Sequence, residues 1–445
     1  VTFPPSFGIT PAQMCLQIAS VSVSGVNKQS KMAACYQPNE HVLTPKSSSN
    51  AVMAAQRSNG PSVRYYCTAG NGMEPFLAEE VKRKLAAEDV HQMSGKVLFS
   101  TSVSIDRVTE LKAAERLFLL LKHDSPVRLS VHTNPGTSKY IRHTDTSSTK
   151  SCGTPCRFSD CLTVRIQLEM TCAVPVSFRV SCKCTGSLAR YFSPQEVSKV
   201  IGVGLARSLG WKADLKNPQL EVNVYLSDDH CLMGIPLTRL PLANRSYIRT
   251  TGLRSTLAWA MASLAQIQPG FCVVDPMCGV GTILIEAAQE HKAACFLGMD
   301  VDDRQLQRAS ENIEFAELGC RIHLLKASSM VLPLANASVD AVICDLPFGR
   351  KFGTKTNMAS NLPVIVTEME RILRVGGTLV ILLSPQLSCL LKKLLAQKDT
   401  DPTSFQKTTP HNLPPPLSSL KHQANLRVSL GAIDGLIHKY VKIDA

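Results

Sequence analysis

The feature that most constrains this chain is one run that reads as a strand, a glycine turn and the start of a helix. It spans residues 273–288, with the sequence VVDPMCGVGTILIEAA. Gly279 and Gly281 let the backbone pass close beneath a ligand, and the helix start offers unpaired N–H groups. The third glycine of a dinucleotide-binding G-x-G-x-x-G turn is absent. With Asp275 four residues ahead of Gly279, the turn suits S-adenosylmethionine, whose amino-acid end carries an ammonium and a carboxylate but no phosphate.

Two later acids follow predicted buried strands. Residues 296–300 (FLGMD) form a short apolar strand ending at Asp300, 19 residues beyond Gly281, where an α/β nucleotide site places a carboxylate for the ribose hydroxyls. Residues 339–344 form a third strand, which runs into Asp345, Leu346, Pro347 and Phe348. Because the carboxyl ends of parallel strands share one sheet edge, these acids are expected to lie together there.

The tetrapeptide at 345–348 resembles the (D/N/S)-P-P-(Y/F) motif of methyltransferases that act on exocyclic amines of nucleobases, with Leu346 where many of them have proline. Such an amine is a poor nucleophile until hydrogen bonds draw its lone pair out of the ring. Asp345 and the main-chain carbonyl of Leu346 are predicted to accept its two N–H groups. Phe348 is predicted to stack on the base, which contributes about 1–3 kcal/mol against the few kcal/mol needed to extrude a paired base.

Several motifs together resemble the THUMP-domain guanosine-N2 RNA methyltransferases. They are LRSTLA at 253–258, DPMCG at 275–279 and DLPFG at 345–349, with CTAGNGMEPF at 67–76 and FRVSCKC at 178–184 upstream. The likeness covers residues 63–123 and 176–445. It implies a Rossmann-like class I methyltransferase domain, α/β with a seven-stranded and mostly parallel sheet, preceded by α+β ferredoxin-like and THUMP domains.

The resemblance and the strand-end positions together give a set of candidate site residues. Many such enzymes carry an aspartate for the adenine amine after the third strand of the domain, whereas this chain has Ala327, Ser328 and Ser329. The candidates for cofactor binding are Asp275, Pro276, Cys278, Gly279, Gly281, Asp300, Ser328, Arg254 and Ser255. The candidates for catalysis are Asp345, Leu346 and Phe348. The candidates for RNA phosphate contacts are Arg179, Lys183, Arg190 and Lys199.

The positive charge of the chain is uneven along its length. Residues 1–250 hold 29 Lys and Arg against 18 Asp and Glu, a balance of +11, whereas residues 251–445 hold 19 against 17, a balance of +2. The excess therefore lies outside the predicted catalytic domain, as expected if a separate domain binds a polyanion. A solubilising surface charge is the alternative.

Composition shifts divide the chain into five parts. Residues 1–60 are polar and aperiodic, and are predicted to be disordered or a non-native extension with Met53 as the true initiator. A ferredoxin-like domain is predicted at 61–123, a linker at 124–175, the THUMP domain at 176–242, and the methyltransferase domain at 243–445 with a disordered loop at 398–424.

The local patterns predict the elements of the first two domains. Strands are expected at 64–68 and 95–100, with helices at 75–85 and 105–121. Strands at 178–184 and 220–226 flank a helix from Pro194 to about Leu209, which Ser193 caps. In the third domain strands and helices alternate, and the chain closes with a hairpin turning at Asp434-Gly435.

Sixteen cysteines in so long a chain, without small-scaffold spacing, favour a reducing compartment. The spacing of Cys152, Cys156, Cys161, Cys182 and Cys184 lacks the paired C-x2-C of zinc knuckles, so no metal site is predicted. No apolar run approaches the length that spans a bilayer, so the protein is expected to be soluble and nuclear, cytoplasmic or both.

The sequence thus predicts an S-adenosylmethionine-dependent RNA methyltransferase forming N2-methylguanosine. The resemblance implies U6 small nuclear RNA as substrate, or otherwise tRNA, and a small zinc-containing activator subunit as partner. The alternatives are a methyltransferase acting on another amine, such as adenine N6 or a protein side chain, and a non-catalytic RNA-binding protein with a relic methyltransferase fold. A dehydrogenase is disfavoured by the glycine spacing.

Overall fold

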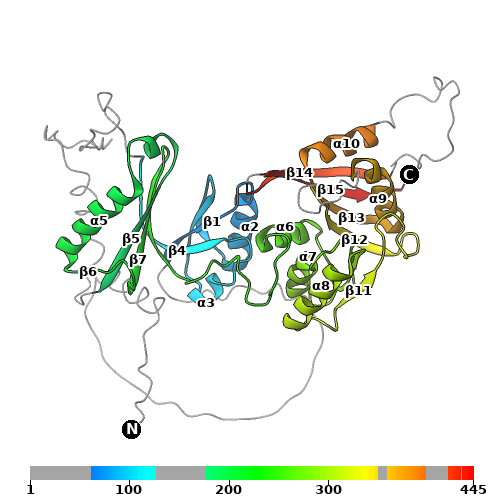
Figure 1. Ribbon diagram of the computed structural model, residues 1–445, viewed down its shortest axis with the longest axis horizontal. Coiled ribbons are helices and arrows are strands. Elements are labelled where there is room, and N and C mark those ends of the chain that lie inside the picture. Colours follow the sequence, from blue (N-terminus) through cyan, green and yellow to red (C-terminus); the bar gives the residue numbers. More distant parts are fainter. Residues whose placement is uncertain (1–61, 127–175, 349–357, 397–418, 432, 445) are drawn as a thin grey trace, which may run out of the picture.

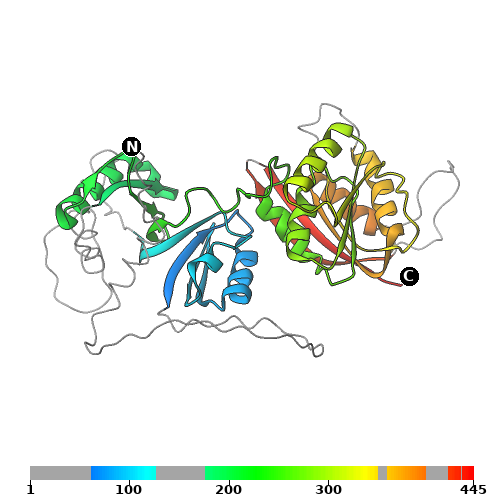
Figure 2. The same ribbon diagram turned by 90° about the horizontal axis from the view of Figure 1, so that it is seen from below.

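The computed structural model describes residues 62–126, 176–348, 358–396, 419–431 and 433–444. These residues form two lobes, one built on an eight-stranded sheet and the other on a seven-stranded sheet (Figures 1 and 2). The extension predicted at 1–60, the linker from residue 127 to 175 and the surface loop from 397 to 418 lie outside the described residues.

The first half of the eight-stranded sheet is a small α+β unit with strand order β2-β3-β1-β4, all antiparallel. Helix α2 packs its apolar face on it, burying Leu77, Val81 and Leu85. The elements are β1 (Val63–Thr68), α2 (Glu74–Leu85), β2 (Glu88–Met93), β3 (Lys96–Thr101), α3 (Ile105–Val108) and β4 (Arg116–Asp124).

The helix predicted at 105–121 is wrong. Only the single turn α3 is helical, and the apolar run that begins at Leu117 lies in β4, a central strand paired with β1 and β8. A short apolar run fits a buried strand and a buried helix equally well. Here the run is a strand because neighbouring strands pair with it on both edges. Strand β2 was not predicted because its residues are polar and it lies at the sheet edge.

The second half of this sheet has a different strand pattern. Strands β5 and β7 are parallel, β7 and β8 are antiparallel, and β8 pairs with β4, so both halves share one continuous sheet. Helix α5 has the predicted bounds, and Ser193 Oγ accepts a hydrogen bond from the N–H of Glu196 (3.3 Å). The elements are β5 (Ser177–Cys184), the 3-10 helix η1 (Gly186–Arg190), α5 (Pro194–Leu209), β6 (Lys212–Ala213), β7 (Leu220–Leu226) and β8 (Cys231–Pro236).

The second lobe confirms the predicted seven-stranded, mostly parallel sheet. Its order is β11-β10-β9-β12-β13-β15-β14, in which β15 runs antiparallel to both of its neighbours and the other adjacent pairs are parallel. The strands are β9 (Cys272–Asp275), β10 (Cys295–Asp300), β11 (Ile322–Lys326), β12 (Val339–Asp345), β13 (Leu373–Leu383), β14 (Leu420–Leu430) and β15 (Ile433–Lys442).

Helices cover both faces of this sheet (Figure 1). Alternate residues of β9 and β12 enter the two cores: Val273 and Ala341 pack with α6, α7 and α8, whereas Val274 and Val342 pack with α9 and α10. Such alternation is the period of a strand buried on both sides. The helices are α6 (Ser255–Leu264), α7 (Thr282–Glu290), α8 (Asp303–Phe315), α9 (Met358–Ile372) and α10 (Pro385–Ala396).

The terminal hairpin is confirmed, but its turn is not where it was predicted. Leu430 pairs with Ile433, so the chain turns at Gly431, which has a φ of +72°, and Asp434 and Gly435 already belong to β15. Strand β14 also begins at Leu420, so residues 420–424 are strand rather than the end of the predicted loop. Within the described residues, no helix is long and apolar enough to span a membrane.

Candidate active site

The glycine turn links β9 to α7 at the carboxyl edge of the sheet. Gly279 and Gly281 have φ values of +53° and +81°, a region in which residues with a Cβ are strained. The N–H of Gly281 donates to the carbonyl of Cys278 (2.8 Å), which closes the turn. A Cβ added to Gly279 would meet no atom within 4 Å, so the protein leaves open space above this residue. The predicted glycine turn is therefore present, with open space beside Gly279.

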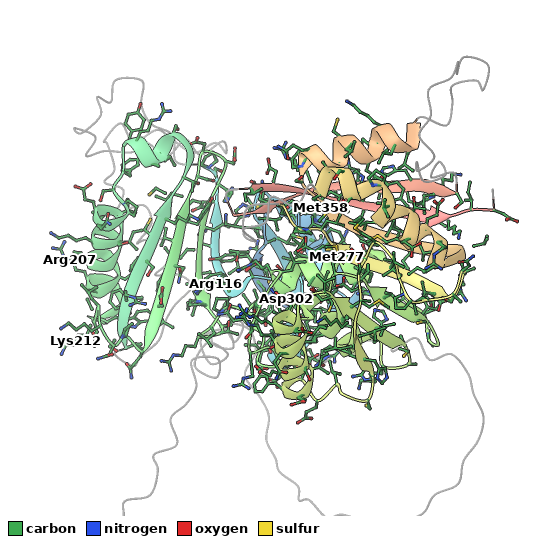
Figure 3. All side chains as sticks on the ribbon, turned by 45° about the vertical axis from the view of Figure 1, so that its right-hand side comes forward. Arg116, Arg207, Lys212, Met277, Asp302 and Met358 are labelled. Carbon is green, nitrogen blue, oxygen red and sulfur yellow. The ribbon has the colours of Figure 1, made fainter. Side chains whose placement is uncertain are left out.

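Asp300 ends β10 and lies against the glycine turn, as its position in the sequence predicts. Its Oδ2 accepts the N–H of Gly279 (3.0 Å), and its Oδ1 accepts the N–H of Asp302 (2.9 Å). Figure 3 labels Asp302 after β10 and Met277 after β9. Each carboxylate oxygen has further lone pairs that can accept additional hydrogen bonds.

Asp275 ends β9 and is almost fully buried, with 1% of its surface exposed. Its Oδ1 accepts the N–H of Met277 (3.1 Å), and the thiol of Cys344 also donates to it. Burial raises the pKa of Asp275 well above the ordinary value, and the nearby carboxylates of Asp345 and Asp300 raise it further. The structure thus brings the three predicted acids into one electrostatic neighbourhood.

Asp345 ends β12, beside Asp275. Burial raises its pKa from 3.8 to about 7. Its Oδ1 is buried and has no hydrogen-bond partner among the described residues. An unpaired buried acceptor is unfavourable unless another group completes it, so this atom is a candidate for ligand binding.

Leu346 and Phe348 follow Asp345 but differ in their surroundings. The N–H of Leu346 donates to the carbonyl of Leu382 (3.1 Å), and its side chain is fully buried in the sheet core, which fixes the backbone at the strand end. Phe348 is half-buried and packs against the core on the other side of the sheet. Residues 349–357 lie outside the described part of the chain.

Pro276 and Cys278 lie buried within the turn itself, and burial raises the pKa of the Cys278 thiol. Ser328 lies beyond β11 on a loop that reaches Asp300, because the N–H of Ala327 donates to the Asp300 carbonyl (3.1 Å). The Ser328 side chain is exposed and its Oγ accepts the N–H of Met330 (3.2 Å), so it serves its own loop here.

Arg254 and Ser255 lie at the start of α6 and point to different partners. The Arg254 guanidinium forms an ion pair with Glu115 of the first lobe, so in this structure it holds the two lobes together. The Ser255 side chain is buried, and its Oγ has no hydrogen-bond partner among the described residues. Ser255 therefore keeps a free polar group, whereas Arg254 does not.

The sequence reading missed Asn312, which fastens the loop before α6 to the glycine turn. Asn312 lies on the buried face of α8 and is fully buried. Its Oδ1 accepts the N–H of Thr250 (3.0 Å), and its Nδ2 donates to the carbonyls of Thr250 (2.8 Å) and Val280 (2.9 Å). The only signal in the sequence was one polar residue on an otherwise apolar helix face.

The candidate RNA contacts lie on the first lobe and are not equivalent. Arg179 on β5 binds Glu221 Oε2 (2.7 Å), so its charge is already paired. Lys183 on the same strand, Arg190 on η1 and Lys199 on α5 are exposed. The ammonium of Lys183 also helps to lower the pKa of buried Lys96, which places two positive charges close together on this lobe.

The five cysteines whose spacing did not predict a metal site fall only partly within the described residues. Cys182 and Cys184 have sulfur atoms 3.9 Å apart on β5, while Cys152, Cys156 and Cys161 lie outside the described residues. Over the described ranges, no group of three or more His, Cys, Asp or Glu side chains could hold a metal ion.

Comparison with protein families gives two matches. Residues 243–407 match the model of the RMKL-like methyltransferase domain, and residues 164–235 match the THUMP domain model. The chain is 36% identical to the U6 snRNA (guanine-N(2))-methyltransferase THUMPD2 of Bos taurus, over 88% of this chain and 99% of that protein.

Two further similarities complete the comparison. The chain is 33% identical to the tRNA (guanine(6)-N(2))-methyltransferase THUMP3 of Bos taurus, over 49% of this chain and 46% of that protein. The fold resembles the crystal structure of TrmN from Thermus thermophilus, with a TM-score of 0.65 and 23% identity over 86% of this chain and 100% of that one. The structural likeness supports the two-lobed fold as a whole.

Proposed function

Because the chain belongs to the family of THUMP-domain, S-adenosylmethionine-dependent RNA guanine-N2 methyltransferases, we propose that it converts one guanosine of U6 small nuclear RNA to N2-methylguanosine. The similarity to the bovine U6 enzyme spans nearly the whole of both proteins, which favours U6 over tRNA. The similarity to the tRNA enzyme spans about half of each chain. A U6 substrate places the protein in the nucleus.

One observation carries the proposal: three carboxyl groups converge beside an open glycine turn, and one of their oxygens lacks a partner. Asp275, Asp300 and Asp345 create a negative region at the strand ends. S-adenosylmethionine carries a sulfonium and an ammonium, so two positive charges would relieve this repulsion. Asp300 would accept the ribose hydroxyls, and the space above Gly279 would receive the amino-acid end. The donor set and the space therefore fit the cofactor.

The remaining candidate groups take subsidiary places in the cofactor site. The Ser255 Oγ is a buried polar group available to a ligand. Pro276 and Cys278 shape the turn, and the main chain near Ser328 lies beside Asp300, where the adenine would follow the ribose. Arg254 would contribute only after leaving Glu115, so we propose it as a contact between the lobes rather than a cofactor ligand.

In the proposed reaction the cofactor supplies a methyl group on a sulfonium, an activated electrophile. The chain's own part is to orient the guanine. Asp345 Oδ1 accepts one N–H of the exocyclic amine, and the carbonyl of Leu346 accepts the other, which turns the nitrogen lone pair toward the methyl group. Phe348 stacks on the base once it is extruded. Methylation leaves a positive nitrogen that loses its proton readily, so positioning and hydrogen bonding suffice without a strong base.

Asp345 must be ionised to accept fully. Since burial raises its pKa to about 7, the negative charge is present only above that range in the free protein. The positive charge of the cofactor would lower this pKa and favour the ionised form. Cofactor binding and hydrogen bonding to the substrate amine are thus coupled through the Asp345 carboxyl group.

The first lobe would hold the RNA. In this proposal residues 61–123 and 176–242 bind the RNA and residues 243–445 methylate it. Lys183, Arg190 and Lys199 are exposed and would contact phosphates, whereas Arg179 is already neutralised by Glu221. Such contacts add sequence-independent affinity that falls with salt.

We also propose a small zinc-containing activator subunit as partner, bound at the outer edge of the methyltransferase sheet. Strand β11 is the edge strand and has unpaired main-chain groups on one side. Exposed apolar side chains gather around it: Leu325 within the strand is 41% exposed, Val331 after it 73% and Val301 after neighbouring β10 62%. Leu325→Glu is expected to abolish co-purification with the activator, whereas Val375→Glu, exposed elsewhere, is expected to keep it.

The decisive experiment is methyl transfer from labelled cofactor into total small RNA, using the protein with its activator. N2-methylguanosine formed by the wild type and lost in Asp345→Ala supports the chemistry, the base and the key residue together. Label in another nucleoside, such as N6-methyladenosine, overturns the guanine assignment. Cofactor binding without any label, in the presence of activator and RNA, overturns the enzyme reading in favour of an RNA-binding protein.

A further inference from the structure

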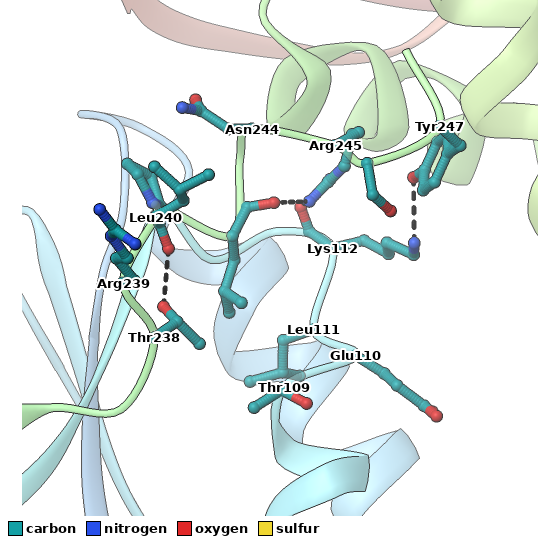
Figure 4. A pocket seen from close by; sticks show the side chains of 13 residues that line it. Thr109, Glu110, Leu111, Lys112, Thr238, Arg239, Leu240, Asn244, Arg245 and Tyr247 are labelled. Carbon is teal, nitrogen blue, oxygen red and sulfur yellow. Dashed lines mark hydrogen bonds between the residues drawn. The ribbon is translucent and has the colours of Figure 1, made fainter. Parts of the chain in front are cut away.

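The junction between the two lobes holds a network of buried charges beside an apolar core, because one cluster of buried apolar side chains runs through both lobes. Helix α2 and the loop at 111–115 of the first lobe meet α6 and α7 of the second, and the connecting segment 237–254 passes between them. A cavity of about 420 Å³ opens beside this junction, lined in part by Lys112, Arg239, Arg245 and Tyr247 (Figure 4).

Glu286 is the centre of the junction. It lies on α7 among Ile, Leu and Ala residues, and its side chain has no exposed surface. Its Oε1 accepts Arg245 Nε (2.9 Å) and the hydroxyl of Tyr247 (3.0 Å). Burial raises the pKa of Glu286, against the lowering effect of Arg245 and Lys112. The same helix begins at the glycine turn, so Glu286 joins the junction to the cofactor site through one rigid element.

Arg245 extends these contacts to the first lobe. Its guanidinium donates to the Lys112 carbonyl (2.6 Å) and to the Leu242 carbonyl (2.6 Å), in addition to Glu286. The Lys112 ammonium in turn donates to the Tyr247 hydroxyl (3.0 Å) and lies over its ring, as Figure 4 shows for the hydrogen bond. One planar guanidinium therefore binds the first lobe, the connection and the second lobe at once.

A second set of charges lies alongside. Lys84 on α2 binds Glu80 Oε1 in its own helix (2.9 Å) and forms an ion pair with Glu290 on α7. Glu80 also accepts the N–H groups of Lys112 (2.9 Å) and Ala113 (2.8 Å). The positive charges of Lys84, Lys112 and Arg245 are thus matched by the carboxylates of Glu80, Glu286 and Glu290.

Directional bonds of this kind fix one arrangement. Domains joined by a small or polar contact are expected to move relative to one another unless specific bonds hold them. A buried pair whose donors and acceptors are all matched in one geometry loses several bonds at once when the lobes rotate. The charged side chains of the junction therefore favour one angle between the lobes.

We propose that Arg245, Tyr247 and Glu286 are positioning residues that hold the RNA-binding lobe at one angle to the methyltransferase lobe, and so select which guanosine of a bound RNA reaches Asp345. This inference rests on the proposed function. A guanosine in a long RNA is held at two places, and its position relative to Asp345 depends on the junction. A guanosine in a short oligonucleotide is held only at the active site and does not depend on it.

Two substrates separate the two cases: a full-length U6 transcript and a short single-stranded oligonucleotide containing guanosine. Tyr247→Phe removes two hydrogen bonds and keeps the ring. Tyr440→Phe is the matched control, because the buried Tyr440 hydroxyl has no partner in the described structure. Tyr247→Phe is expected to lose about tenfold in kcat/KM on the transcript, and Glu286→Gln about 100-fold, since small misplacements have effects of this size. Both are expected to keep wild-type kcat/KM on the oligonucleotide and wild-type affinity for S-adenosylhomocysteine.

A selective loss on the transcript, with methylation shifted to neighbouring guanosines, supports the proposal. Small-angle scattering of the variants is then expected to show a wider spread of lobe arrangements. An equal loss of kcat/KM on both substrates would mean that these residues only stabilise α7 locally, and it would overturn the proposal. Unchanged kcat/KM on both substrates would overturn it as well. Tyr247→Phe decides the matter if Glu286→Gln does not fold. Absence of methylation by the wild type on both substrates would instead refute the proposed function.

Discussion

Replacing Asp345 with asparagine should make the methyltransferase domain more stable, and the gain should be larger at high pH. Burial raises the pKa of this carboxyl from 3.8 to about 7. Between these two values the folded protein keeps a proton that the unfolded chain has lost, so folding stability falls as pH rises through that window. Above pH 7 the Asp345 carboxyl is ionised in the folded protein, so the full free-energy cost of burying its charge is present.

The size of the effect follows from the pKa shift. One pKa unit corresponds to about 1.4 kcal/mol, so the carboxyl costs about 1.5 kcal/mol at pH 5 and about 4 kcal/mol at pH 8. Asparagine does not titrate, and the local cost of burying its amide is the same at both pH values. The gain in unfolding free energy on Asp345→Asn should therefore be larger at pH 8 than at pH 5 by roughly 2–3 kcal/mol.

Urea unfolding at the two pH values measures this difference. The chain has two tryptophans, Trp211 in the first lobe and Trp259 on α6. A Trp211→Phe background leaves Trp259 as the reporter of the methyltransferase domain. Asp303→Asn is the control, because that carboxyl is mostly exposed and should give the same change at both pH values.

A stability change that is equal at pH 5 and pH 8 would refute the reasoning, since it would mean that Asp345 titrates like a solvated carboxyl. Asp345→Ala, which removes the acceptor oxygen that asparagine would keep, should lose about 100-fold or more in methyl transfer, as when one preorganised hydrogen-bonding group is removed from an active site. Gain of stability in Asp345→Asn together with loss of activity in Asp345→Ala would identify Asp345 as a group kept for function at the expense of folding.

Three further variants test the remaining parts of the site. Gly279→Ala is expected to abolish cofactor binding in calorimetry, because its Cβ would enter the open space above the turn. Gly270→Ala is the control: Gly270 also has a positive φ (+85°) and free surroundings but lies away from the site, so this variant should bind the cofactor normally. Lys183→Ala is expected to weaken RNA binding and to reduce the slope of log affinity against log salt by about 1, whereas Arg179→Ala, already paired with Glu221, should leave the slope unchanged. Phe348→Ala is expected to raise the KM for RNA by an amount equivalent to the roughly 1–3 kcal/mol of a lost stacking contact, whereas Phe348→Tyr should keep the wild-type KM. Equal KM values for the two variants would show that Phe348 does not stack on the base.

Much of the methyltransferase lobe could be read from the sequence because its signals are local. A strand, a glycine turn and a helix start follow one another within residues 273–288, and the acids at 300 and 345 each end a buried strand. In a parallel sheet, ending a strand is enough to place a residue at the ligand edge. No distant contact needs to be known.

The features that the sequence did not reveal depend on distant partners. The apolar run after Arg116 became a strand because β1 and β8 flank it, and neither pairing leaves a mark on the run itself. Arg254 carries a family-like motif but pairs with Glu115, 139 residues away. Glu286 stood out only as one charge in an apolar helix, and its partner Arg245 lies in a segment without periodicity.

The two buried charge clusters of this protein are balanced in opposite ways, and the contrast bears on function. At the junction every carboxylate faces a cation, as at Glu286 with Arg245 and Glu290 with Lys84. At the strand ends Asp345 and Asp300 raise the pKa of buried Asp275, and none of the three forms an ion pair in the described part of the chain. The buried acids of the junction are thus neutralised by cations of the protein. The three clustered acids at the strand ends lie around open space without such cations, so a bound ligand would balance their charge. The cation expected there is the sulfonium of the methyl donor.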